Sequence, residues 1–127
     1  MSKGVVVLIK KDDKFLFIEE KRDLMLGCWA PPHGRMEENE SEPEAVIREV
    51  KEEVGLDVEP IKKITETKAD TKVKTVEWWE ARIKGDAKIN IDEEEVADFG
   101  WFSVREALEL KLYPGTKLFL EKFGDKL

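Results

Sequence analysis

The sequence predicts a mixed α+β domain in which helices cover a β-sheet. Three observations support this class: the chain opens with two strand-like runs, a well-bounded amphipathic helix follows, and further strands precede short helices at the end. A length of 127 residues is usual for one domain. We therefore expect a single domain over residues 1–127, without a linker or an internal repeat.

The first two strands are expected to form a hairpin. Residues 4–9 (GVVVLI) are a short apolar run typical of a buried strand, and residues 14–20 (KFLFIEE) form the expected return strand. The polar stretch at residues 11–14 (KDDK) predicts the turn between them. Residues 21–34 contain two prolines and two glycines, so we expect a loop there.

A helix with marked ends is predicted between Ser41 and Gly55. Ser41 suits the N-cap position, and Glu44, three residues later, completes a capping box. Gly55 suits the left-handed residue that often ends a helix. At 100° per residue, aliphatic and acidic residues separate onto two sides. The aliphatic side contains Val46, Ile47, Val50 and Val54, and the acidic side contains Glu49, Glu52 and Glu53.

The second half of the chain predicts more strands and then two short helices. Strand patterns cover residues 58–64, 72–84 and 99–102, and an acidic loop over residues 92–98 precedes the last of them. The helices are expected at residues 103–112, where Ser103 and Glu106 repeat the capping box, and at residues 116–123.

Charge and composition narrow the functional classes. The formal net charge of −7 argues against a general nucleic-acid-binding protein, because such proteins need a basic surface. A nucleotide substrate is compatible with this charge, since bound divalent cations reverse the local sign. The lone Cys28 cannot form an intrachain disulfide, which favours a reducing, cytoplasmic location. No stretch has the pattern of a signal peptide or a membrane span, so we expect no membrane partner.

The acidic side of the predicted helix indicates a metal site. Carboxylates three and four residues apart on a helix repel one another, whereas Mg²⁺ and Mn²⁺ prefer carboxylate oxygens as ligands. Arg48 can fix the rotamer of a neighbouring carboxylate, and Gly34 can turn its carbonyl toward a metal. Such a set predicts metal-assisted attack of water on phosphorus. The alternative is a solvated acidic face stabilised by lysines such as Lys51.

The segment from residue 34 to residue 56 resembles the Nudix box, whose pattern is G, five residues, E, seven residues and R-E-U-x-E-E-x-G-U, where U is a bulky aliphatic residue. All nine specified positions match. They are Gly34, Glu40, Arg48, Glu49, Val50, Glu52, Glu53, Gly55 and Leu56. The flanking residues are also similar, from the strand that ends at Arg22 to the acidic loop before Trp101, so that the resemblance covers roughly residues 4–110.

This resemblance implies an α/β/α sandwich with a mixed sheet, and hydrolysis of a nucleoside diphosphate linked to another moiety with Mg²⁺ or Mn²⁺. By motif position, the expected metal set is Gly34 through its carbonyl, Glu49, Glu52 and Glu53. Arg48 is expected to orient a glutamate, and Glu40 either binds metal or braces the loop. The general base is either Glu49 or a glutamate of the acidic loop, where Glu95 fits best, ahead of Glu94 and Glu93.

Four residues outside the box are candidates for substrate contacts. Arg22 matches a family arginine that often contacts phosphate, and His33 stands where many members have glycine, so it either contacts phosphate or belongs to the loop. Trp78 and Trp79 point to opposite sides of a strand, so one belongs to the core and the other can stack on a base. We assign the stacking role to Trp79.

The expected substrate is a small nucleotide or another pyrophosphate. A nucleoside polyphosphate, either a dinucleoside polyphosphate or a modified nucleoside triphosphate, comes first. The alternatives are a non-standard substrate, such as a nucleotide sugar or a prenyl or inositol phosphate, and a non-catalytic nucleotide-binding module. Family members often form dimers, and the sequence leaves a homodimer open.

Overall fold

The computed structural model describes residues 2–22, 25–69 and 73–127, which form a sheet with helices on both faces. The strands are β1 (Lys3–Lys11), β2 (Lys14–Glu20), β3 (Trp29–Ala30), β4 (His33–Arg35), β5 (Val58–Lys68), β6 (Thr75–Ile83) and β7 (Val96–Phe102). The helices are α1 (Glu42–Val54), α2 (Val104–Ala107), α3 (Pro114–Phe123) and the 3₁₀ helix η2 (Gly124–Lys126). None of the described helices has the length and hydropathy needed to cross a membrane.

The central strand β1 organises the sheet. Neighbouring strands follow the order β3-β2-β1-β6-β5, with β4 paired to β1 and β7 paired to β2. One edge of β1 runs parallel to β6, while its other edge pairs with β4 near Val5 and with β2 near Lys10. This divided edge brings β4, which carries Gly34, beside the middle of the molecule.

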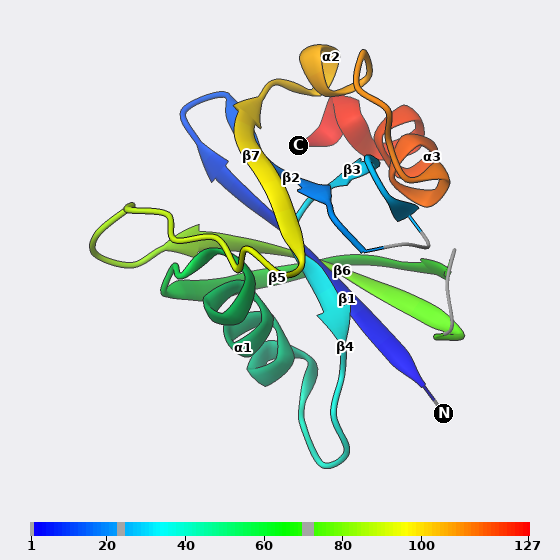
Figure 1. Ribbon diagram of the computed structural model, residues 1–127. Coiled ribbons are helices and arrows are strands. Elements are labelled where there is room, and N and C mark those ends of the chain that lie inside the picture. Colours follow the sequence, from blue (N-terminus) through cyan, green and yellow to red (C-terminus); the bar gives the residue numbers. More distant parts are fainter. Residues whose placement is uncertain (1, 23–24, 70–72) are drawn as a thin grey trace.

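Helices cover both faces of the sheet, which confirms the expected α/β/α sandwich. Figure 1 shows α1 on one side of the sheet and α3 on the other. Alternate residues of β1 enter the two cores: Val5 and Val7 pack with α1, and Val6 and Leu8 pack with α3. Burial on both faces explains why this strand is a continuous apolar run rather than an alternating one.

Helix α1 begins and ends as the sequence predicts. The Ser41 side chain accepts a hydrogen bond from the backbone N–H of Glu44, the Glu44 side chain accepts one from the backbone N–H of Ser41, and Gly55 adopts φ 74°.

The predicted division of α1 into an aliphatic and an acidic side is wrong at two positions. Ile47 is 44% exposed, whereas Glu53 is only 2% exposed. The buried side consists of two i, i+4 rows, one with Ala45, Glu49 and Glu53 and the other with Val46, Val50 and Val54. The row with Glu49 and Glu53 therefore faces β4 of the sheet instead of the solvent, because Gly34 of β4 has no side chain to occupy the space of Glu49.

Several element ends differ from the predictions. Short strands β3 and β4 lie inside the predicted loop, β5 continues to Lys68, and β7 already begins at Val96. The predicted start of β6 at residue 72 lies outside the described residues, and the described strand begins at Thr75.

The helix expected over residues 103–112 ends at Ala107. The backbone around Lys111 and Tyr113 instead bonds to Trp29, with N···O distances of 2.7 and 3.0 Å, and this pairing holds the segment extended. Helix α3 begins two residues early, at Pro114, where proline suits the first helical position.

Candidate active site

Glu49 of α1 lies directly against Gly34 of β4. A Cβ atom placed on Gly34 would lie 1.9 Å from Glu49 Oε2 and 2.0 Å from its Cδ, which is far inside van der Waals contact. Only glycine therefore lets this carboxylate approach the β4 backbone. The contact joins the glycine that opens the motif to the helical part of the motif, which follows after the loop before α1.

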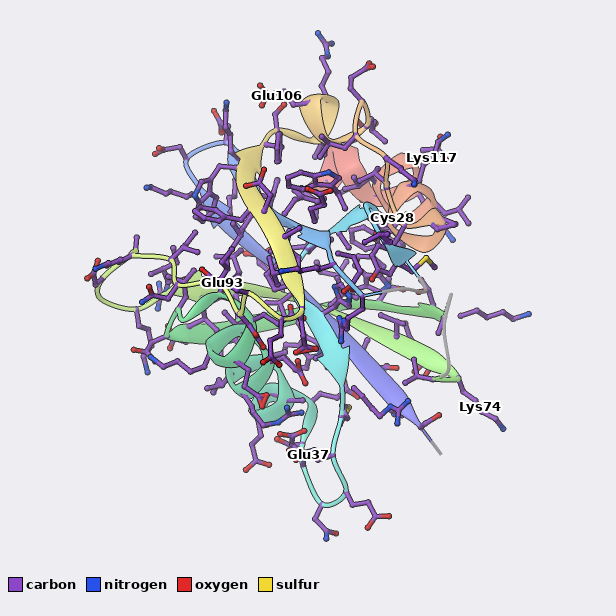
Figure 2. All side chains as sticks on the ribbon, viewed as in Figure 1. Cys28, Glu37, Lys74, Glu93, Glu106 and Lys117 are labelled. Atoms are coloured by element: carbon purple, nitrogen blue, oxygen red, sulfur yellow. The ribbon has the colours of Figure 1, made fainter. Side chains whose placement is uncertain are left out.

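Arg48 bonds to three carboxylates at once, those of Glu40, Glu49 and Glu52. Its Nε and Nη2 donate to both oxygens of Glu40 at 2.6 and 3.0 Å, and Nη1 donates to Glu49 at 2.8 Å and to Glu52 at 3.1 Å. Nη2 also donates to the carbonyl oxygen of Arg35 at 2.9 Å. The paired hydrogen bonds lower the pKa of Glu40. Glu40 thus braces the loop through Arg48, which matches one of its two expected roles. Figure 2 shows Glu37 on this loop, which projects between β4 and α1.

Glu53 is a buried carboxylate with few cationic neighbours. Its Oε1 accepts the backbone N–H of His33 at 2.9 Å, and the nearest Arg22 nitrogen lies 3.8 Å from Oε2. Burial raises the pKa of Glu53 to about 7, even though His33 and Arg22 act in the opposite direction. Burial also raises the pKa of Glu49, against the effect of Arg48. A divalent cation beside these carboxylates would favour their charged forms.

The donor set fits Mg²⁺ or Mn²⁺ by its chemistry. Within the described ranges, no three histidine, cysteine or acidic side chains converge on a single point, because Arg48 separates Glu49 from Glu52. Mg²⁺ usually takes only one or two protein carboxylates and completes its shell with waters and substrate phosphates. The side chain of Glu52 is 53% exposed and can reach a cation at the surface, whereas the side chains of Glu49 and Glu53 are largely buried.

A second network surrounds the buried Glu20 at the end of β2. Arg22 donates to Glu20 from Nε at 2.6 Å, from Nη2 at 2.8 Å and from its backbone N–H at 3.1 Å. The Tyr113 hydroxyl donates to Glu20 Oε1 at 2.5 Å, and His33 Nε2 lies 3.5 Å from the same oxygen. Burial would raise the pKa of Glu20, but the hydrogen bonds from His33, Arg22 and Tyr113 outweigh it and hold the pKa far below the usual value.

His33 is held in its charged form by this network. Nδ1 lies 2.8 Å from the carbonyl oxygen of Pro31, which can only accept, so Nδ1 carries a proton. Nε2 lies 3.2 Å from the Tyr113 hydroxyl, whose own proton is directed to Glu20, so Nε2 must also donate. Burial lowers the pKa of His33, but the interaction with Glu20 and the charge of Glu53 reverse this and raise the pKa to about 9.

The acidic loop before β7 reaches the site through Arg22. Glu95 Oε1 accepts Arg22 Nη1 at 2.6 Å, while Lys21 donates to the carbonyl oxygen of Glu93 at 2.7 Å. Figure 2 shows Glu93 on the segment that leads into β7. Arg22 therefore lies between Glu20, Glu53 and Glu95, so the three expected residues Arg22, Glu53 and Glu95 come together.

A pocket of about 420 Å³ opens beside this charged centre. Arg22, His33 and Gly34 form part of its lining, together with the apolar wall of Val6, Val76 and Trp78. The volume lies in the usual range for small-molecule sites.

The structure corrects the assignment of the two tryptophans. Trp79 is not part of the pocket lining, since it packs with the α1 core and its indole N–H donates to Glu42 at 2.9 Å. Trp78 lies on the pocket side instead, but it is 2% exposed and stacks on Phe119 at 3.9 Å. The alternation along β6 decided this: Trp79 faces α1 and Trp78 faces α3.

Sequence reasoning missed Glu20 and Tyr113 as parts of the site. Glu20 is the last residue of a predicted strand, and Tyr113 lies between the two predicted C-terminal helices. An acidic residue two positions before Arg22 was the one available sign that Glu20 could belong to the site. Glu20 and Tyr113 are 93 positions apart in the sequence, so only the fold brings these two residues together.

The chain is similar to known proteins in sequence and in fold. The family model described as NUDIX domain matches residues 2–123. The asymmetrical bis(5′-nucleosyl)-tetraphosphatase of Sus scrofa is 32% identical over 101 residues, covering 74% of this chain and 68% of that enzyme. An ADP-ribose pyrophosphatase of Methanocaldococcus jannaschii is 49% identical over 49 residues, which are 39% of this chain and only 29% of that protein. A NUDIX hydrolase structure from Nitrosomonas europaea has a TM-score of 0.86 at 18% identity, covers 98% of this chain and 70% of that one, and shows the shared fold.

Proposed function

This chain belongs to the NUDIX domain family, and from that premise we propose that it is a metal-dependent diphosphohydrolase for nucleoside polyphosphates. One observation supports this most strongly: the acidic row of α1 meets Gly34 at the edge of a pocket that Arg22 and His33 also line. Carboxylates for a divalent cation and cationic side chains for phosphate are thus adjacent. A pyrophosphate group needs both.

Glu49, Glu52, Glu53 and the Gly34 carbonyl would hold the cation. The bound metal would polarise phosphoryl oxygens, offset developing negative charge and lower the pKa of an attacking water. Arg48 fixes Glu49 and Glu52, and the backbone N–H of His33 fixes Glu53 at 2.9 Å. These contacts preorganise the carboxylates before the substrate arrives.

Two residues are candidates for the general base that takes the proton from the attacking water. Glu49 is favoured by burial, which raises its pKa and makes it more basic. Glu95 is the alternative, but its Oε1 is bonded to Arg22 Nη1 at 2.6 Å. Arg22 would have to turn from Glu95 to a substrate phosphate before Glu95 could act.

Cationic side chains support a substrate with several phosphates. Besides Arg22 and His33, the lining contains Arg35 and Lys68, whose charged ends have no ion-pair partner within the described part of the chain. This concentration of positive charge contrasts with the net charge of −7. The tetraphosphatase relative covers more of this chain than the pyrophosphatase relative, which favours polyphosphates.

A substrate panel with Mg²⁺ and Mn²⁺ tests the proposal. The panel contains diadenosine tetraphosphate, canonical and oxidised nucleoside triphosphates and ADP-ribose, and the products are separated by chromatography. We expect hydrolysis of at least one polyphosphate. Glu53→Gln and Glu52→Gln should lower kcat by on the order of 10² to 10³, as when one electrostatic stabiliser of a transition state is removed.

The control is Glu109→Gln, which neutralises an exposed glutamate outside the site. It should keep wild-type turnover. Unchanged hydrolysis in both site variants would contradict the metal assignment. Hydrolysis of ADP-ribose alone would favour the alternative substrate class, the nucleotide sugars. No hydrolysis of any anhydride would favour a non-catalytic binding module.

A further inference from the structure

The Arg22 guanidinium lies close to two buried carboxylates but bonds to only one of them. Its Nη2 donates to Glu20 Oε1 at 2.8 Å and lies 3.8 Å from Glu53 Oε2. A hydrogen bond of this kind is about 2.9 Å long, so Nη2 lies roughly 1 Å too far from Glu53 to bond. Both glutamates are 2% exposed, so the depth of burial does not explain why Arg22 bonds to Glu20.

Glu20 is the better partner because it holds Arg22 at two points from a fixed position. Arg22 Nε donates to Oε2 at 2.6 Å while Nη2 donates to Oε1, and such a pair of bonds fixes the plane of the guanidinium. The backbone N–H of Glu20 donates to Cys28 at 2.8 Å, and its carbonyl oxygen accepts the N–H of Gly27 at 2.9 Å. Oε1 also accepts the Tyr113 hydroxyl at 2.5 Å. Arg22 is the adaptable member of the pair, since its side chain is 46% exposed.

Without this hold, Arg22 would turn to Glu53. The carboxylate of Glu53 accepts the backbone N–H of His33 at 2.9 Å through Oε1, while Oε2 is the oxygen nearest to Arg22 Nη2. A guanidinium that closed the remaining gap would form a charge-assisted hydrogen bond. Arginine keeps its charge in proteins, so it would compete with a divalent cation for the same carboxylate. Metal binding would then require that bond to be broken first.

We propose that Glu20 is a positioning residue that keeps Arg22 off Glu53 and so leaves Glu53 available to a divalent cation. The inference rests on the proposed function, because it takes Glu53 as a metal ligand. The hold on Nε and Nη2 leaves Nη1 directed to Glu95 at 2.6 Å, and Nη1 is the end of Arg22 that can turn to a substrate phosphate. One carboxylate thus keeps a fixed cation and a metal cation apart in the same site.

A double-mutant cycle on Mn²⁺ affinity tests this without hydrolysis. Dissociation constants for Mn²⁺ are measured by electron paramagnetic resonance, without substrate, on the wild type, Glu20→Gln, Arg22→Gln and the double variant. We expect Glu20→Gln alone to weaken Mn²⁺ binding about tenfold or more, the range of one hydrogen bond to a charged group. In the Arg22→Gln background the same substitution should cost less than about threefold, because the competing guanidinium is gone. Equal losses in both backgrounds would overturn the proposal, because Glu20 would then act on the metal through its charge alone.

Two further variants complete the experiment. Glu109→Gln removes an exposed negative charge outside the site and should bind Mn²⁺ as the wild type does. Glu20→Asp keeps the charge on a shorter side chain and takes the place of Glu20→Gln in the cycle if circular dichroism shows that the latter does not fold. Its loss of affinity should likewise disappear in the Arg22→Gln background. If the wild type binds no Mn²⁺, the metal assignment and this inference fail together, whereas measurable binding with equal losses overturns only the role of Glu20.

Discussion

At the scale of single residues, Gly34 decides where Glu49 can lie. The contact between the two residues requires that Gly34 has no side chain, because a Cβ there would come within 2.5 Å of both carboxylate oxygens of Glu49. The two residues belong to different elements and are joined only in the fold. The motif's first glycine therefore has a packing reason in addition to the carbonyl ligand that the family resemblance implies.

Gly34→Ala should displace the Glu49 carboxylate, because the side chain is flexible and yields before the backbone does. We expect kcat to fall on the order of a hundredfold while circular dichroism and the melting temperature change little. The loss of stability that does occur should shrink when Glu49 is already alanine, since the clash is then gone. Full activity in Gly34→Ala would contradict this packing.

At the scale of elements, α1 shows which features the local sequence determines and which depend on tertiary contacts. Its capping box and its glycine stop are local and appear as predicted. Its orientation is not local, because the side facing the sheet contains Glu53 and excludes Ile47. Helix α2 has the same capping box, with Ser103 as N-cap, yet it is only 4 residues long, since the chain after it pairs with Trp29.

Removing each N-cap compares the two helices. Ser41→Ala and Ser103→Ala should each cost about 1 kcal/mol in the free energy of unfolding, because one hydrogen bond to the first turn is lost. For a chain of this size that lowers the melting temperature by roughly 3 to 5 °C.

Turnover should change by less than about twofold in both variants, since Glu49 and Glu53 lie two to three turns beyond Ser41. Thermal unfolding and a hydrolysis assay measure the two effects. An unchanged melting temperature in Ser41→Ala would show that the capping box does not hold α1.

At the scale of the whole molecule, Glu20 ties together parts of the chain that are far apart in sequence. It receives hydrogen bonds from Arg22 near β2 and from Tyr113 at the start of α3, and lies 3.5 Å from His33 of β4. All four residues of this network line the same pocket. The network also makes folding stability depend on the charge of His33.

The charge of His33 gives a pH dependence with a defined sign. Its pKa is about 9 in the folded protein against 6.5 for the free side chain. A group whose pKa is raised by folding stabilises fully below its unfolded pKa. This contribution should therefore be complete below about pH 6.5 and lost as pH rises through about 9.

As His33 is the single histidine, its ring protons give one NMR titration curve in the metal-free protein. We expect a midpoint near 9 in the wild type and a lower one in Glu20→Gln, which removes the charge of the partner. Denaturation at several pH values should show the matching loss of stability, and Glu20→Gln should flatten it. A midpoint near 6.5 in the wild type would contradict the network.

The sequence by itself determined what is local or periodic. Apolar runs identified the β1–β2 hairpin, cap residues marked the ends of α1, and fixed spacings indicated the carboxylates, Arg48 and Gly34 as one chemical set. Local backbone preference and nearby hydrogen bonds encode such features, so a linear pattern is enough to reveal them.

Only the tertiary structure decided which distant residues share a site. The burial of Glu53, the packing of Trp79 against α1 and the contact between Glu20 and Tyr113 all depend on which strand edges and helix ends meet. Such contacts join residues many positions apart through packing. A change of one strand neighbour would rearrange them while leaving every local pattern intact.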